Sequence, residues 1–174
     1  MPIVTPRQFT AMLERAQREK FGYPAINCSN MESVRAAING FESAQSDGLV
    51  QISISSAKKV SCVDAVDGAL ALAEYAERYA RGKKIQIALT TDHCETKDIS
   101  FLDGLIADSQ ARVARGASPL FQGMMYDGSH DPLADNIKVA VTYLQKLAPL
   151  GITLETEIGQ TGGVEDGLAG DASY

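Results

Sequence analysis

The sequence lacks any uninterrupted run of about 18 apolar residues, the length that a membrane-spanning helix requires. Its first residues, MPIVTPRQFTAML, also lack the basic stretch and apolar core of a secretory signal. These two absences argue against the membrane and secreted classes. We therefore expect a cytoplasmic protein without a membrane partner.

Positive charge is scarce as well. The 174 residues carry a formal net charge of -6, and lysine and arginine are scattered, with only short clusters such as 81–84. A nucleic-acid partner would need a basic face, which this pattern does not provide. A small anionic substrate is still compatible with the composition, because a local site can be positive while the surface is acidic.

Cysteine is also rare. Cys28, Cys62 and Cys94 are odd in number and widely spaced. This spacing matches neither a disulfide framework nor a zinc knuckle. We expect reduced thiols that are buried near strand ends, since free cysteine is commonly buried.

What the sequence does contain is an alternation of short apolar runs with helix-length segments. The apolar runs predict strands at 24–27, 49–53, 85–91, 119–122 and 152–157. Helical spacing of apolar residues predicts helices at 5–20, 31–44, 64–79, 99–115 and 131–148. This alternation is typical of a parallel α/β fold. Periodicity leaves open whether the sheet is doubly wound or part of a closed barrel, but residues 27–30 lack the Gly-x-Gly-x-x-Gly turn of a dinucleotide-binding module.

Polar and ionisable residues gather where these strands are predicted to end. They are Asn27, Ser53, Asp92, His93, Asp127 and Glu157. Because the carboxyl ends of strands in a β/α fold face one mouth, we expect these side chains to converge. Each of them alone has another explanation, since strand-end residues often cap the next helix.

The pair Asp92-His93 follows the third predicted strand. A histidine in this place is a candidate zinc ligand, and the adjacent carboxylate suits proton transfer beside a metal, or else caps a turn. Glu155 and Glu157 share one face of the fifth strand, where one carboxylate reaches a cation or both are solvated. His130 lies in a polar turn, and we interpret it as a solvated loop residue.

A glycine-rich segment, residues 159–167, carries Glu165. Such a loop can swing a carboxylate over a site. A catalytic zinc usually has three protein ligands. The chain offers one good histidine plus carboxylates, so we expect an incomplete zinc site.

Four separated motifs carry a resemblance to a known family. They are Pro24-Ala-Ile-Asn-Cys28, Thr91-Asp-His-Cys94, Tyr126-Asp-Gly-Ser129 and the run from Leu154 to Gly167. In order and spacing they resemble class II, zinc-dependent fructose-bisphosphate aldolases along essentially the whole chain. The resemblance implies a TIM-type (β/α)8 barrel, usually a homo-oligomer. It also implies Zn²⁺-dependent, reversible cleavage of fructose 1,6-bisphosphate into dihydroxyacetone phosphate and glyceraldehyde 3-phosphate.

The resemblance further implies roles for individual residues. Asp92 is similar to the acid that handles the proton of the C4 hydroxyl, and Glu165 to a loop acid that moves a proton at the enediolate carbon. His93 is similar to the first zinc ligand. Asp127 and Glu157 resemble carboxylates that hold the metal in an alternative or second site, where a second divalent or a monovalent cation binds.

Asn27 and Ser53 resemble polar residues that line the substrate pocket of that family. A full barrel takes about 250 residues, so residues 1–174 are expected to form an N-terminal part of one barrel, with roughly the first five β/α units. Two further zinc histidines and the phosphate-binding segments of the family are expected beyond it.

Two alternatives stay open. Val164 replaces one of two consecutive loop glutamates and is compatible with tagatose-bisphosphate aldolases, whose loop commonly reads Gly-Gly-x-Glu-Asp. The other alternative is a non-catalytic remnant, because an open parallel sheet has an unpaired edge and an uncovered face, for which we expect self-association.

Overall fold

The fold is a succession of strand–helix units. The computed structural model describes residues 2–61, 63–159, 163–165 and 168–170. The elements in chain order are α1 (Pro6–Glu19), β1 (Ala25–Asn27), α2 (Met31–Ala44), β2 (Gly48–Ile52), α3 (Ile54–Val60), α4 (Ala65–Tyr79), β3 (Ile87–Thr91), η1 (Thr96–Asp98), α5 (Ser100–Ala114), β4 (Gly123–Asp127), α6 (Leu133–Leu147), η2 (Ala148–Leu150), β5 (Thr153–Glu157), β6 (Gly163–Glu165) and β7 (Leu168–Gly170).

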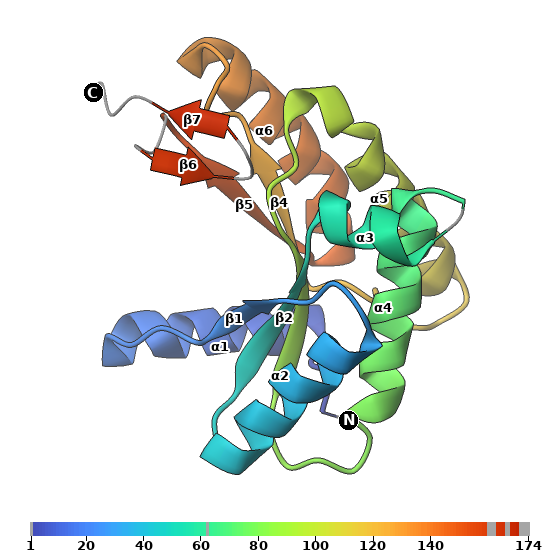
Figure 1. Ribbon diagram of the computed structural model, residues 1–174. Helices are drawn as coiled ribbons and strands as arrows, with labels where there is room; N and C mark the ends of the chain where they lie inside the picture. The colour runs from blue at the N-terminus through green and yellow to red at the C-terminus, as the bar shows by residue number, and fades with distance from the viewer. Residues whose placement is uncertain (1, 62, 160–162, 166–167, 171–174) are drawn as a thin grey trace.

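The first five strands form one parallel sheet whose spatial order, β1-β2-β3-β4-β5, follows the chain. Helices α2, α4, α5 and α6 cover one face, and α1 lies on the other side (Figure 1). A doubly wound sheet reverses its strand order and places connecting helices on both faces. Consecutive order with the connecting helices on one face is instead the arrangement of a (β/α)8 barrel. The predicted fold class, five β/α units of such a barrel, is confirmed.

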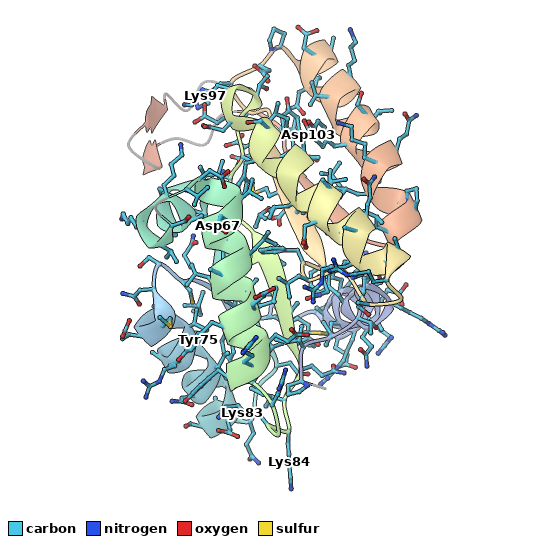
Figure 2. The ribbon with its side chains drawn as sticks, turned by 90° about the vertical axis from the view of Figure 1, so that its right-hand side faces the viewer. Asp67, Tyr75, Lys83, Lys84, Lys97 and Asp103 are labelled. Atoms are coloured by element: carbon cyan, nitrogen blue, oxygen red, sulfur yellow. The ribbon has the colours of Figure 1, made fainter. Side chains whose placement is uncertain are left out.

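The outer face of the sheet holds the main core. Side chains alternate in direction along each strand, so Val50 and Ile52 of β2 and Leu89 of β3 point outward and are fully buried. Figure 2 shows α4, α5 and α6 side by side over this face. Each fully buried aliphatic side chain contributes about 1.5–3 kcal/mol, so this layer fixes the strands that carry the site.

The inner face is covered at one end by α1. Phe9 and Met12 of this helix pack in a small cluster with Ala88, the second residue of β3. The helix begins with a capping box, because Thr5 Oγ1 accepts a hydrogen bond from Gln8 N (3.3 Å) and Gln8 Oε1 accepts one from Thr5 N (2.8 Å). The helix thus covers the amino-terminal ends of the strands and leaves their carboxyl ends open.

The fourth strand corrects the sequence analysis. We predict it at 119–122, and that prediction is wrong, since β4 spans Gly123–Asp127. Gln122 explains the difference: its Oε1 accepts a hydrogen bond from Leu89 N (2.8 Å) and its Nε2 donates to the carbonyl of Leu120 (2.9 Å). Because the side chain of Gln122 takes the place of a backbone partner for β3, residues 119–122 do not form a strand.

The other predicted helices and strands are confirmed, with boundaries that differ by a few residues. The last long helix starts at Leu133 rather than 131, because Pro132 is its N-cap residue. The elements that were not predicted are the short helix α3, the 3-10 helices η1 and η2, and the antiparallel pair β6–β7, which follows β5 in the chain. Within the described parts of the chain, no helix is both long and apolar enough to cross a membrane.

Candidate metal centre and active site

The predicted strand-end residues do lie at strand ends, although the strand that carries Asp127 was predicted too early in the chain. Asn27, Asp127 and Glu157 are the last residues of β1, β4 and β5, while Ser53 and Asp92 directly follow β2 and β3. Strands β4 and β5 are in parallel register with Asp127 opposite Glu157. The parallel sheet therefore brings these five positions to one edge.

Asn27 and Asp92 are in direct contact, although 65 positions separate them in the chain. Nδ2 of Asn27 donates a hydrogen bond to Oδ2 of Asp92. The backbone N–H of Asp92 donates to the carbonyl of Ile52 (3.2 Å), which ties the residue to the end of β2. The Asp92 carboxylate is thus held at the mouth by contacts with two other strands.

His93 lies between two carboxylates. Its Nδ1 is 2.9 Å from Oδ2 of Asp127 and 3.3 Å from Oε2 of Glu157. The three side chains are half-buried, with 19%, 10% and 19% of their surface exposed. Three strand ends thus supply one compact cluster of an imidazole and two carboxylates.

Asp127 is held in its ionised form. Burial acts to raise its pKa, but hydrogen bonds from Ser129 and the neighbouring His93 outweigh burial, and the pKa lies below its ordinary value. One of these bonds runs from Ser129 N to Asp127 Oδ1 (2.9 Å). An ionised carboxylate at this place favours a cation beside it.

Glu155 behaves in the opposite way. It shares the inner face of β5 with Glu157, as the alternation predicts. Its side chain is exposed toward the open inner face, yet desolvation by the surrounding strands raises its pKa, and the charges of Asp92 and Glu157 act in the same direction. The mouth thus concentrates negative charge, which a bound cation would offset.

The cluster fits a metal ion by its donor atoms. One ligand atom from each of His93, Asp127 and Glu157 lies within 4.8 Å of the others. Imidazole nitrogen and carboxylate oxygen are both zinc ligands, and two donors bound tetrahedrally at 2.0–2.1 Å lie about 3.3 Å apart. The His93–Glu157 distance equals this spacing and the His93–Asp127 distance is shorter. The predicted metal-binding residues therefore come together as a set.

Ser53, like Asn27 and Asp92, lies outside that cluster. Ser53 is buried and caps α3, since its Oγ accepts a hydrogen bond from Ser56 N (3.2 Å) and contacts Ser55 Oγ (3.0 Å). It stands at the mouth, and its recorded hydrogen bonds are to its own helix. The backbone of Glu165 belongs to β6, and its side chain lies outside the described residues.

The remaining histidine and two of the cysteines match their simpler interpretation. His130 is exposed in a turn. Cys28 and Cys94 are free and buried near strand ends, and Cys62 lies outside the described residues. Burial raises the pKa of Cys28 to about 11 and that of Cys94 to about 12. These two thiols are therefore protonated and poorly suited to bind a metal.

One residue of this region was missed by the sequence analysis. Asn136 of α6 is buried and donates from Nδ2 to the backbone carbonyl of Glu157 (2.7 Å). A signal for it was available, because helical spacing places this polar residue on the same face as Ala140, Tyr143 and Leu147.

The chain is similar in sequence to known proteins. Residues 7–174 match the family model described as fructose-bisphosphate aldolase class-II. The chain is 45% identical over 173 residues to a fructose-bisphosphate aldolase of Streptomyces galbus, covering 97% of this chain and 51% of that protein. It is 44% identical over 175 residues to the one of Mycobacterium leprae, covering 98% and 51%. The chain thus spans about half the length of the curated relatives it matches.

A solved structure shows the same architecture. The fructose-bisphosphate aldolase of Campylobacter jejuni superposes with a TM-score of 0.84 at 30% sequence identity, covering 92% of this chain and 48% of that one. The parallel sheet and its helices therefore correspond to about half of that aldolase chain.

Proposed function

This chain belongs to the class II fructose-bisphosphate aldolase family, and on that premise we propose that it supplies metal-holding and proton-transferring residues for zinc-dependent cleavage of fructose 1,6-bisphosphate. The products are dihydroxyacetone phosphate and glyceraldehyde 3-phosphate, and the reaction is reversible. Since the chain spans about half of its relatives, we assign the remaining zinc ligands and the phosphate-binding segments to the half of the barrel that it does not cover.

The convergence of His93, Asp127 and Glu157 carries this proposal. Their ligand atoms come from the ends of three strands and lie within 4.8 Å of one another. These three residues would hold the zinc ion, with the carboxylates also suited to a second divalent or a monovalent cation. When bound, the ion supplies Lewis-acid stabilisation of the negative charge that develops on the substrate carbonyl oxygen.

Asp92 is the proposed proton carrier at C4. In the cleavage direction its carboxylate takes the proton of the C4 hydroxyl, the C4–O bond becomes a carbonyl, and the electron pair of the C3–C4 bond stays on C3. In the condensation direction the same proton returns to the C4 oxygen. Asn27 orients this carboxylate through the Nδ2 hydrogen bond, which leaves the other oxygen, Oδ1, to face the substrate.

Glu165 is the proposed acid for the second proton transfer, in which C3 gains a proton after the C3–C4 bond breaks. Its place in the segment that follows β5 motivates this role. Asn27 and Ser53, on neighbouring strand ends, are proposed to line the substrate pocket. We further propose that the complete protein is a homo-oligomer whose substrate is a small sugar bisphosphate.

A second candidate substrate is tagatose 1,6-bisphosphate, which differs from the first at C4. Val164 favours it, since the segment reads Gly-Gly-Val-Glu-Asp. The epimers place the C4 hydroxyl on opposite sides, so the position of Asp92 relative to the substrate decides between them.

The test uses a chimera in which these 174 residues are continued by the C-terminal half of the Streptomyces galbus relative. We expect cleavage of fructose 1,6-bisphosphate that is lost on chelation and restored by Zn²⁺. Asp92→Asn should lower kcat by about 100-fold or more, the usual contribution of an acid–base group. Asp103→Asn removes an exposed carboxylate on α5 and serves as the matched control.

The outcomes separate the alternatives. A folded, zinc-loaded chimera that prefers tagatose 1,6-bisphosphate would reassign the substrate and retain the mechanism. Full activity of Asp92→Asn would refute the role of Asp92. A folded, zinc-loaded chimera that cleaves neither sugar would leave the non-catalytic remnant as the better description.

A further inference from the structure

Asn136 is a buried polar residue with no role in the chemistry described above. It lies in α6, its exposed fraction is 2%, and it faces the sheet together with Tyr143 and Leu147. Buried polar groups are costly unless they are hydrogen-bonded. The bond from Asn136 Nδ2 to the carbonyl of Glu157 (2.7 Å) therefore ties α6 to the last residue of β5.

The same amide also touches the end of β4. A Cβ atom on Gly128 would lie 2.5 Å from Cγ, 2.7 Å from Nδ2 and 2.8 Å from Oδ1 of Asn136. Such distances are too short for any side chain, so glycine at 128 is what allows the amide to reach its position. Gly128 directly follows Asp127. One buried amide thus rests against the backbone beside both carboxylates of the cluster.

This contact matters because the pairing of β4 with β5 ends next to it. Asp127 and Glu157 are the last paired positions of β4 and β5, and strand ends open locally unless something holds them. The carbonyl of Glu157 is held by Asn136. Releasing it would let the end of β5 move and carry the Glu157 carboxylate away from His93.

We propose that Asn136 is a positioning residue that sets the separation of the Asp127 and Glu157 carboxylates and thereby the metal affinity of the cluster. The inference rests on the proposed function, since it assumes that the cluster binds zinc. Residues behind metal ligands commonly alter metal affinity by 10–100-fold. Because Asn136 acts on the backbone rather than on the ligand atom, we expect an effect of about tenfold.

The experiment titrates the protein with Zn²⁺ by calorimetry and with Co²⁺ by visible absorption. Asn136→Ala and Gly128→Ala should each weaken metal binding about tenfold and change the Co²⁺ spectrum, which reports ligand geometry rather than stability. Thr142→Ala removes a hydroxyl on the outer side of the same helix, where it bonds to the Lys138 carbonyl, and should leave both readouts unchanged.

The double variant gives the sharpest result. The three atoms nearest to a Cβ on residue 128 all belong to the Asn136 amide. Once Asn136 is alanine, these three close contacts are gone, so Gly128→Ala should add little further to the loss. This non-additivity is expected only if the two residues act through their mutual contact.

Each result decides the inference. Unchanged affinity and spectrum in folded Asn136→Ala, or losses that add up in the double variant, would overturn it while the metal site stands. No metal binding by the unaltered protein would overturn the proposed site and this inference with it. Should Asn136→Ala fail to fold by circular dichroism, Gly128→Ala, which keeps the amide but displaces it, carries the same expectation alone.

Discussion

Two adjacent threonines on β3 offer a direct test of how the site is held. Thr91 is fully buried and its Oγ1 accepts a hydrogen bond from Met125 N (2.9 Å), across the seam between β3 and β4. Thr90 is also buried, but its Oγ1 has no hydrogen-bonding partner among the described residues. Valine has the same shape as threonine without the hydroxyl. The same substitution at these neighbouring positions should therefore affect the free energy of unfolding differently.

Thr91→Val leaves the buried N–H of Met125 without an acceptor, which costs about 1–3 kcal/mol of unfolding free energy. Thr90→Val removes a hydroxyl that has no partner in the described parts of the chain, so the protein should be within about 0.5 kcal/mol of the original or more stable. With a typical urea m-value of about 2 kcal/mol per M, Thr91→Val should lower the midpoint by about 1 M.

The assay is equilibrium urea unfolding followed by far-UV circular dichroism, with amide hydrogen exchange at Met125 as a local readout. Thr142→Val on the exposed side of α6 is the control, and its cost should stay within about 0.5 kcal/mol. Faster exchange at Met125 in Thr91→Val alone is expected. Equal stability of Thr91→Val and the original, or equal losses for Thr90→Val and Thr91→Val, would refute the hydrogen-bond reasoning.

Three more predictions follow from the cluster, from a buried thiol and from α6. Zn²⁺ at 100 times its Kd should stabilise the protein by about 3 kcal/mol in thermal melts, and His93→Ala should lose this gain. Burial raises the pKa of Cys28 to about 11 from 9.0. The stability that the buried, protonated thiol contributes is therefore fully present below pH 9 and is lost as the pH rises through 11. The unfolding free energy should therefore fall by about 1 kcal/mol more between pH 8 and pH 10 in the original than in Cys28→Ala. Ile137 and Val141 lie on an exposed apolar stripe of α6, with exposures of 51% and 47%, and lysine at both should weaken self-association in sedimentation velocity.

Each of these has an outcome that contradicts it. Equal zinc stabilisation in His93→Ala would remove that residue from the ligand set. Parallel pH profiles for Cys28→Ala and the original would show that the thiol does not titrate across that range. Thr142→Lys adds charge on the same helix away from the apolar stripe, so a loss of self-association equal to that of the lysine pair would point to net charge rather than the stripe.

The stripe on α6 has a physical basis in the architecture. It comprises Leu133, Ile137, Val141 and Leu144, each about half exposed. The salt bridge of Lys146 to Asp103 marks the side of α6 that faces α5, and helical spacing puts the stripe on the opposite side. In a barrel the next outer helix packs on this side of its neighbour, and we therefore predict that the exposed stripe takes part in self-association.

Much of the fold was predictable because it depends on local physics. Alternation of apolar runs with amphipathic segments follows from the periods of strand and helix, and the caps at Thr5, Asn30 and Asp64 mark the helix starts seen in the structure. The fourth strand was misplaced because Gln122 satisfies backbone groups of another strand with its side chain. Such a contact does not alter the spacing of apolar residues, from which the strands were predicted.

The candidate site was likewise predictable in one part and not in another. The sequence by itself determined which polar residues come together and which chemistry they offer, because a parallel β/α order brings all strand ends to one edge. It placed the strand before Asp127 too early. Only the tertiary structure decided that His93 lies 2.9 Å from Asp127, 34 positions away, that Asn27 contacts Asp92, and that Asn136 reaches the carbonyl of Glu157. Strand register and helix packing set these distances, and both arise from contacts between segments that are remote in the chain.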